Sequence, residues 1–400
     1  MTEEKNEGNS IEDSFRDCKV VSYSDYCTAV MRGAHLPTLI AFSSVNTPRG
    51  KFKPFKVIAE CSCNLIFVND SANNWYLKGV EGFGDDFKTS AKNIINLART
   101  IGNGKAITFG TSMGAYGALL YAAAGNADFS LSFGPEVLLD MPGSRSEQHK
   151  AKDAQLPYSD FSELIDRSET MHYVFTSECD EVDMINALAL NKIKKVKAVS
   201  VRGVEHPGIQ VFAEKEGVAE FIDRALLDPS SIIQFDQRGE ILGNEELVKD
   251  LWIAYGLKKD KNFRSYLGYL ESQKWKSHTS SAFMHRLGEA YYRNNDQANA
   301  IECLKEAIRL DELQYESYNL LGVIQRRKRL HSEAENNLRR SLSISPRNAF
   351  AHHNLGMLLL EMHQIKEAVI SFEKAVKINK GNTAFAKSLA EAKEKLIAML

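Results

Sequence analysis

The chain has 400 residues, 44% of them hydrophobic and 26% charged, which is enough apolar material for two or three packed domains. A formal net charge of −2 argues against a general binder of nucleic acids or anionic membranes. No apolar run approaches the roughly 18 residues that a membrane span needs. Six cysteines without paired spacing favour a reduced, cytoplasmic protein with no zinc site.

The chain begins with an acidic, polar segment, residues 1–20, which lacks the apolar stretch of a signal peptide. We expect this segment to be a disordered tail. The following stretch, "VVSYSDYCTAVMR", could supply one or two edge strands.

Residues 21–228 alternate short apolar runs with helical patterns, which predicts an α/β domain with a mainly parallel sheet and flanking helices. The expected core strands are 37–43, 64–69, 105–109, 129–133, 172–176 and 196–201. The expected helices are 52–60, 85–101, 112–124, 159–167, 182–192 and 208–226.

One serine stands at a predicted strand-to-helix turn, in "AITFGTSMGAYGALLYAAA". Ser112 lies between Gly110 and Gly114, and a nucleophile elbow requires small residues at those two positions. A glycine-rich turn before a helix is the alternative interpretation. The helix N-terminus would direct N–H groups and a positive dipole towards a developing oxyanion.

Through this elbow the chain resembles the α/β-hydrolase family over roughly residues 35–226. The resemblance implies the chain order serine, acid, histidine, each after a strand. Asp180, in "TSECDEVD", then orients the histidine, with Asp183 as the reserve candidate. Helix capping alone could also explain both carboxylates. Cys179, beside them, is interpreted as structural rather than as a nucleophile.

The resemblance also assigns the base and the oxyanion hole. His206, after the last predicted strand, would take the Ser112 proton. One oxyanion donor would be the N–H of Met113, and the second that of Ser44 or Val45. Many relatives carry His-Gly at the latter position, so this chain departs from the pattern there.

A further loop, "NDSANNWYLKGVEGFGDD", follows a predicted strand and carries two large aromatic residues, Trp75 and Tyr76. Loops at the carboxyl ends of parallel strands form binding sites, so both could line the substrate mouth. They could equally belong to a packed loop.

The last part of the chain carries a 34-residue period: Leu287-Gly288, Leu321-Gly322 and Leu355-Gly356 recur at this spacing. The pattern resembles tetratricopeptide repeats over residues 281–382, three helix–turn–helix units that form an all-α superhelix. Residues 383–400 are expected to form a capping helix, and residues 229–280 a helical connector or a divergent repeat. The resemblance implies a groove that binds a protein partner, but its first-helix positions lack the cationic clamp for an acidic chaperone tail.

The leading hypothesis is a cytoplasmic serine hydrolase of esters or similar acyl bonds, without cofactor or metal and joined to a protein-binding repeat module. The substrate would be a small molecule or an acylated glycan or protein; neither a nucleic-acid partner nor a membrane span is expected. The alternative is a non-catalytic adaptor that uses a hydrolase-like fold and the repeat groove to bind proteins.

Overall fold

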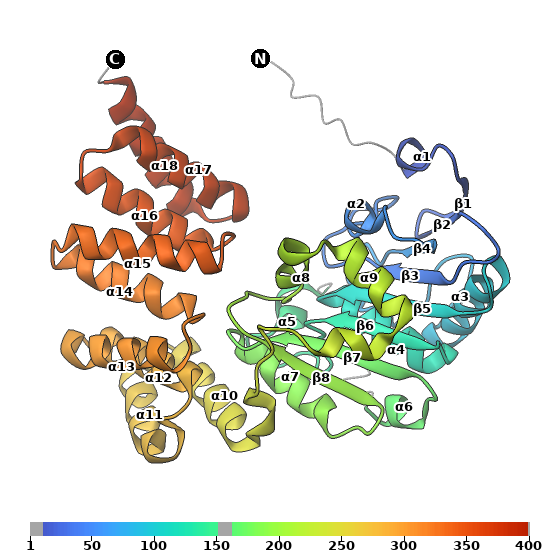
Figure 1. Cartoon of the computed structure of the whole chain (residues 1–400), viewed down its shortest axis with the longest axis horizontal. Helices are drawn as coiled ribbons and strands as arrows, with labels where there is room; N and C mark the ends of the chain where they lie inside the picture. Colours follow the sequence, from blue (N-terminus) through green and yellow to red (C-terminus); the bar gives the residue numbers. More distant parts are fainter. Residues whose placement is uncertain (1–10, 151–161, 399–400) are drawn as a thin grey trace. The chain divides into compact units, whose positions relative to one another are not determined.

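The computed structural model describes residues 11–150 and 162–398 and divides the chain into two compact units (Figure 1). Unit 1 comprises Met1–Val201 and His206–Glu245, and unit 2 comprises Arg202–Glu205 and Glu246–Leu400. Unit 1 thus extends beyond the expected boundary at residue 228. The 3₁₀ turn η1 (Pro229–Ile233) packs on helix α9 (Val218–Leu227), and the 3₁₀ turn η2 (Ile241–Gly243) packs on strand β8 (Val196–Val201).

The described part of unit 1 is built on one eight-stranded sheet with the order β1-β2-β4-β3-β5-β6-β7-β8. Strands β3 to β8 run parallel to one another, whereas β1 pairs antiparallel with β2 and β2 pairs antiparallel with β4, so the expected edge strands are present. The strands are β1 Lys19–Ser24, β2 Cys27–Met31, β3 Thr38–Phe42, β4 Asn64–Val68, β5 Ala106–Thr111, β6 Phe129–Phe133, β7 Met171–Ser177 and β8 Val196–Val201.

Helices α2 to α7 connect the parallel strands, as the alternating sequence pattern predicts, whereas α1 precedes β1 and α8 and α9 follow β8. The helices are α1 Ile11–Ser14, α2 Phe55–Ile58, α3 Phe87–Ile101, α4 Met113–Gly125, α5 Arg145–His149, α6 Ser162–Arg167, α7 Glu181–Asn191, α8 Gln210–Lys215 and α9 Val218–Leu227. The single helix expected over 208–226 is two helices, because Gly217 interrupts it at a φ of 87°.

Helix α4 is buried from Met113 to Ala123 and therefore packs closely on its neighbours. A Cβ added to Gly117 would lie 2.5 Å from Cδ2 of Tyr76, so only glycine fits at this approach. The small residues that follow Ser112 thus allow α4 to lie against the sheet, which fixes the position of its N-terminus.

The prediction of a disordered tail over residues 1–20 is wrong for residues 11–20. Residues 1–10 lie outside the described residues. Ile11–Ser14 form helix α1, and β1 begins at Lys19. Phe15 is only 4% exposed, and its ring centroid lies 6.3 Å from that of Phe67. Burial of this aromatic side chain explains why ordered structure begins before residue 20.

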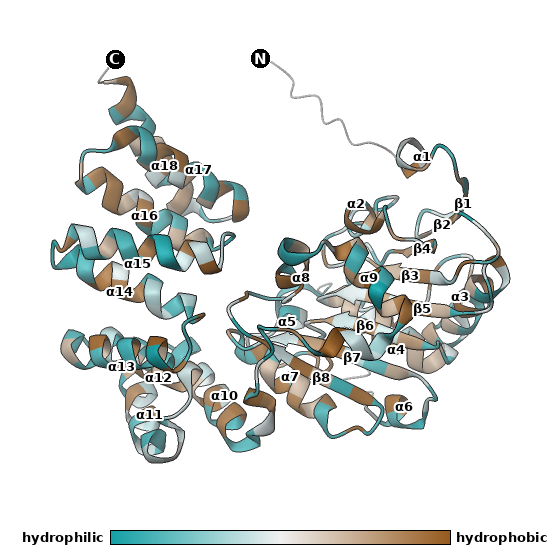
Figure 2. Cartoon of the chain, in the orientation of Figure 1, coloured by the Kyte–Doolittle hydropathy of each residue, from teal (hydrophilic) through white to brown (hydrophobic). Residues whose placement is uncertain are grey.

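Unit 2 is helical throughout its described residues, and hydrophobic and hydrophilic residues alternate along its helices (Figure 2). The helices are α10 Glu245–Lys259, α11 Phe263–Ser277, α12 Ser281–Arg293, α13 Gln297–Leu310, α14 Tyr315–Arg327, α15 His331–Ile344, α16 Ala349–Glu361, α17 Ile365–Ile378 and α18 Thr383–Ile397. Helix α18 occupies the expected capping segment, and α10 and α11 make the region before residue 280 a helix pair.

One small-to-large contact recurs within the helix pairs of unit 2. A Cβ on Gly288 would lie 2.9 Å from Cγ of Leu304, and one on Gly322 would lie 2.7 Å from Cγ of Leu338. Gly356 has the same relation to the ring of Phe372. The 34-residue period of the sequence therefore corresponds to one repeated close helix–helix contact.

Replacement of Ala334 by leucine should destabilise unit 2 by about 1–3 kcal/mol, because an inserted side chain overpacks a dense core. Ala334 is 0% exposed and belongs to the cluster that includes Leu338 and Leu358. Urea unfolding followed by circular dichroism measures the change. Ala298→Leu, at an exposed position on α13, is the matched control and should be nearly neutral. Loss of the unit 1 fold in the Ala334 variant would contradict the division into two units.

Candidate functional site

Ser112 lies in the sharp turn between β5 and α4, with φ 56° and ψ −123°. A non-glycine residue at such dihedral angles costs roughly 1–3 kcal/mol, which the surrounding packing must offset. A Cβ at Gly110 would overlap the carbonyl of Gly114, and a Cβ at Gly114 would overlap the carbonyl of Phe42. The two glycines therefore meet the steric requirement predicted for them, and the Ser112 side chain is partly exposed.

His206 follows β8 and is held by a carboxylate of helix α7. Its Nδ1 lies 2.7 Å from Oδ1 of Asp183, whose side chain is 2% exposed. The opposite ring nitrogen, Nε2, is buried and has no hydrogen-bond partner among the described residues. A buried, unpaired imidazole nitrogen is the atom that a general base would offer to a nucleophile.

The turn after β6 connects Ser112 with His206. The N–H of Ser112 donates to the carbonyl of Phe133 over 2.9 Å, while a Cβ on Gly134 would lie 2.7 Å from Cε1 of His206. Ser112 and the His206 ring therefore both contact the dipeptide Phe133-Gly134. Within the described residues, no hydrogen bond joins the Ser112 hydroxyl to His206.

Asp180, the carboxylate predicted to orient the histidine, makes a different set of contacts. It caps α7 by accepting from the N–H of Asp183 over 2.9 Å, and it pairs with Arg145. Burial is the largest single influence and opposes its negative charge, but the Arg145 charge and the hydrogen bonds from Arg145 and the Asp183 N–H together hold the pKa of Asp180 below its usual value. The carboxylate in contact with His206 is the reserve candidate, Asp183, which corrects the first choice.

Arg145 is a member of this site that the sequence analysis did not identify. Its guanidinium contacts Asp180 and lies 3.3 Å from Oδ1 of Asp183. The start of helix α5, on which it stands, is fixed because Glu136 accepts from the N–H of Arg145 over 2.9 Å and from that of Ser146 over 2.8 Å. A lone arginine in a polar segment gives no signal of such a role.

The predicted oxyanion-hole donors flank the elbow. Met113 is the first residue of α4, where backbone N–H groups have no partner within the helix. Ser44 and Val45 follow β3, and their carbonyls accept from Thr47 Oγ1 over 2.6 Å and from the Lys53 ammonium. In the described part of the chain no acceptor contacts the N–H groups of these three residues. The adjacent N–H of Ser43 is already bonded to the Val68 carbonyl at 2.9 Å.

Trp75 and Tyr76, predicted as a possible substrate mouth, are each 1% exposed and belong to the core of unit 1. The hydroxyl of Tyr76 donates to the Ser43 carbonyl over 2.6 Å, and its ring packs edge-on against Phe42. They therefore form no open rim, which favours the packed-loop alternative. Tyr76 instead supports the backbone that leads into Ser44.

Within residues 11–150 and 162–398, Asp180, Asp183 and His206 form a group that could hold a metal ion, since their ligand atoms lie within 4.8 Å of one another. Arg145 already places a positive charge against both carboxylates. A divalent cation would face repulsion from this guanidinium, so the donor set does not fit a metal. We assign neither a metal nor a cofactor to the site.

The first helices of the repeats in unit 2 carry polar side chains that pair from one helix to the next. His285 lies 2.9 Å from Ser317 Oγ, and Asn354 donates to Asn319 over 2.9 Å. His353 lies 3.0 Å from Ser388 Oγ. Several polar groups of this surface are therefore hydrogen-bonded within the array.

No helix in the described ranges is both long and apolar enough to cross a bilayer.

Comparisons with known proteins match unit 2. Sequence models of the tetratricopeptide repeat match residues 281–313 and 349–382, and a second such model matches residues 315–348. The Cell division cycle protein 27 homolog of Caenorhabditis elegans is 33% identical over 100 residues, which are 24% of this chain and 12% of that protein. The chain thus spans only a small part of that relative.

Three solved structures show likeness over about a third of the chain. The crystal structure of MamA is 22% identical, covers 36% of this chain and 84% of its own, and has a TM-score of 0.32. PilF of Pseudomonas aeruginosa is 18% identical, with coverages of 38% and 68% and a TM-score of 0.35. The first repeat domain of Spaghetti (RPAP3), bound to an HSP90 peptide, is 14% identical, with coverages of 30% and 94% and a TM-score of 0.29. Together with the recurring helix contacts, the sequence models identify the region between residues 281 and 382 as tetratricopeptide repeats, a protein-interaction module.

Proposed function

We propose that unit 1 is a serine hydrolase of ester or similar acyl bonds and that the tetratricopeptide repeats bring it to a protein partner. One observation carries the proposal. The strained Ser112 and His206 both contact the dipeptide Phe133-Gly134, and His206 is hydrogen-bonded to the buried carboxylate of Asp183. The order Ser112, Asp183, His206 along the chain agrees with the α/β-hydrolase resemblance.

In the proposed reaction, the Ser112 hydroxyl attacks the acyl carbonyl and Nε2 of His206 accepts the hydroxyl proton. Asp183 holds Nδ1 of the ring and stabilises the imidazolium that forms. The N–H of Met113, with that of Ser44 or Val45, would bind the oxyanion. His206 then protonates the leaving group, and water releases the acyl group from Ser112 by the reverse proton transfers.

A second candidate function is a non-catalytic adaptor, and two observations favour it. The family models that match this chain lie in the repeat region, whose function is protein interaction. The absence of a hydrogen bond between Ser112 and His206 in the described structure also suits this reading, although catalytic hydrogen bonds are often long in enzymes without substrate. An adaptor would bind proteins through both units without an activated serine.

A fluorophosphonate probe separates the two functions, because only an activated serine reacts readily with it. The full chain should be labelled, and Ser112→Ala should lose the label. Ser272→Ala, at an exposed serine of α11, is the matched control and should label normally. Absence of labelling in the folded wild-type chain would favour the adaptor. Labelling that persists in Ser112→Ala would reject Ser112 as the nucleophile.

We further propose that the substrate is a small acyl ester or an acylated glycan or protein. A panel of activated esters with acyl chains of increasing length tests this choice, since a preference for long chains would argue against it.

A further inference from the structure

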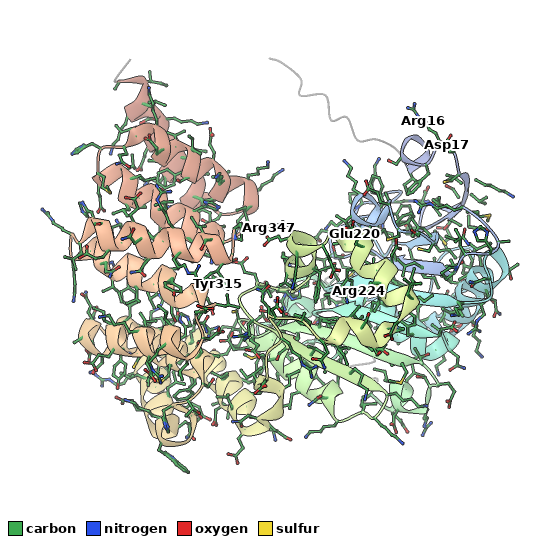
Figure 3. The ribbon with its side chains drawn as sticks, viewed as in Figure 1. Arg16, Asp17, Glu220, Arg224, Tyr315 and Arg347 are labelled. Atoms are coloured by element: carbon green, nitrogen blue, oxygen red, sulfur yellow. The ribbon has the colours of Figure 1, made fainter. Side chains whose placement is uncertain are left out.

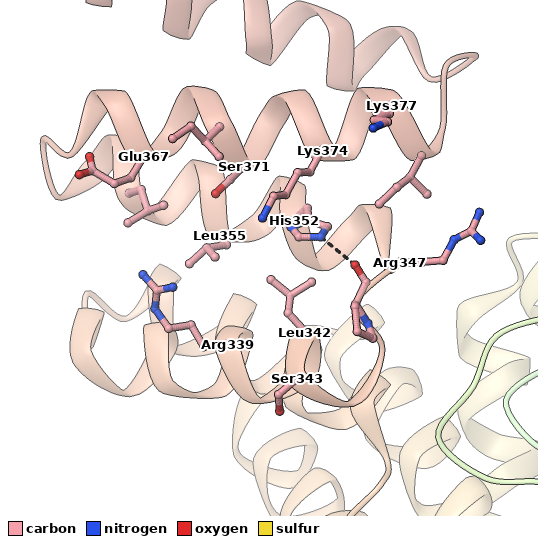
Figure 4. A pocket seen from close by; sticks show the side chains of 14 residues that line it. Arg339, Leu342, Ser343, Arg347, His352, Leu355, Glu367, Ser371, Lys374 and Lys377 are labelled. Atoms are coloured by element: carbon pink, nitrogen blue, oxygen red, sulfur yellow. Dashed lines mark hydrogen bonds between the residues drawn. The ribbon is translucent and has the colours of Figure 1, made fainter. Parts of the chain in front are cut away.

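A groove of about 690 Å³ runs between two second helices of the repeats, α15 and α17 (Figure 4). Helix α16 lies behind it, and the side chains of His352 and Leu355 form part of its floor (Figure 4). Nε2 of His352 lies 3.0 Å from the Pro346 carbonyl, which ties the floor to the turn between α15 and α16. This groove is distinct from the surface formed by the first helices of the repeats, where His285 pairs with Ser317 and Asn354 with Asn319.

Part of the groove is apolar and open to solvent. Leu342, Leu355 and Leu359 line it together with two isoleucines of α17. Ile370 is 54% exposed and Ile378, two turns further along α17, is 37% exposed, so the helix presents two large aliphatic side chains to solvent. Exposed apolar side chains within a groove favour a ligand that carries apolar groups of its own.

The charged residues of the groove are mainly cationic. Arg339, Arg347, Lys374 and Lys377 line it, with Glu367 as the acidic member. Arg339 pairs with Glu335 on its own helix, whereas no carboxylate in the described ranges lies within ion-pair distance of the other three cations. Arg347 extends from the turn after α15 (Figures 3 and 4).

Some cations elsewhere in unit 2 are ion-paired, and three of them show the pattern. Lys258 lies 2.7 Å from Glu289, and Arg286 lies 3.1 Å from Glu316. Arg326 is likewise paired, with Glu361. The groove thus places four cations and a single carboxylate next to exposed apolar side chains, and one of these cations, Arg347, also acts electrostatically on Glu205.

We infer that this groove binds an acidic, amphipathic peptide segment of a protein partner. Carboxylates of the peptide would meet Lys374, Lys377 and Arg347, while its apolar side chains would cover Ile370 and the leucine floor. A nucleic acid would satisfy the cations but would leave the aliphatic residues without a partner, so the peptide fits the groove better. The inference does not depend on hydrolase activity in unit 1.

Fluorescence anisotropy with the full chain tests this inference. The probe is a labelled peptide of about ten residues that alternates Glu with Leu, compared with peptides that alternate Lys with Leu and Glu with Ser. The Glu-Leu peptide should bind most tightly, and its affinity should fall with added salt because charge pairing contributes. A labelled single-stranded RNA should bind more weakly than this peptide.

Two groove variants locate the binding. Lys374→Glu combined with Lys377→Glu should weaken binding of the Glu-Leu peptide by roughly tenfold or more, through like-charge repulsion. Ile370→Ser keeps the charge and should weaken it roughly threefold or more. Lys305→Glu combined with Lys395→Glu makes the same charge change at exposed positions outside the groove and should have little effect.

Several results would overturn the inference. They are failure of the wild-type chain to bind the Glu-Leu peptide, equal binding of the Lys-Leu peptide, tighter binding of RNA, or equal losses in the groove and control variants. Thermal unfolding of each variant shows whether the fold is intact. If the double lysine variant unfolds, unchanged binding by a folded Ile370→Ser chain is enough to reject the groove.

Discussion

Ser112→Ala should reduce turnover of an activated ester by roughly 10³-fold or more, because no other group can form the acyl-enzyme. His206→Ala should cause a loss of similar size, since an unaided serine hydroxyl is a poor nucleophile. The double variant should be little worse than either single variant, because nucleophile and base act as one unit. Steady-state kinetics on the purified full chain, with circular dichroism to confirm the fold, measures all three.

The activity loss of the double variant tests whether Ser112 and His206 act together. If the losses of the two single variants multiply in the double variant, serine and histidine contribute independently and do not form a nucleophile–base pair. Near-full turnover by a folded Ser112→Ala chain would reject the hydrolase and leave the adaptor as the function of unit 1. Relief of backbone strain at Ser112 is not a concern in this variant, because alanine keeps a Cβ in the same position.

Asp183→Asn should reduce turnover by roughly 10³- to 10⁴-fold, because an amide cannot stabilise the imidazolium and favours the wrong tautomer of His206. Asp180→Asn is the matched comparison three residues away and should cost less than about tenfold. Asparagine can still cap α7, and Arg145 keeps its contact with Asp183. The rate of fluorophosphonate labelling measures both variants on one scale, independently of any substrate.

Each outcome for this pair of carboxylates has a distinct meaning. A damaging Asp180→Asn with a silent Asp183→Asn would show that the 2.7 Å contact between Asp183 and His206 is not the one used in the reaction. Equal, severe losses in both variants would indicate that Arg145 and its two carboxylates work as one unit around the imidazole. Unfolding midpoints separate these results from simple loss of stability.

Local sequence patterns predicted the parallel strands of unit 1 and the repeats of unit 2. The alternation of apolar runs with helical stretches predicted the six parallel strands, since hydrophobic periodicity directly reflects which faces are buried. The 34-residue spacing of Leu-Gly pairs predicted the repeats, because each glycine must accept the large residue of its partner helix at the same place. The glycines around Ser112 predicted the turn geometry, because Gly110 must make room for the Gly114 carbonyl four residues further along the chain.

The choice between Asp180 and Asp183 depended on contacts between distant segments. Both residues lie at the start of α7, three positions apart, so either could face the site. Arg145, which comes from α5, pairs closely with Asp180, and His206, which comes after β8, reaches Asp183. A pattern along one helix carries no information on which of two neighbouring carboxylates a remote arginine or histidine will approach.

The same limit applies to the aromatic loop and to the N-terminal segment. Trp75 and Tyr76 follow a strand, as residues of a binding site do, but their rings fill space beneath Ser43 and beside α4. Phe15 stands in a polar segment and is buried only because Phe67 and Arg32 lie where its ring can pack. Burial of a single side chain is a property of the assembled sheet and helices, since the partners that exclude water from it are far away in the sequence.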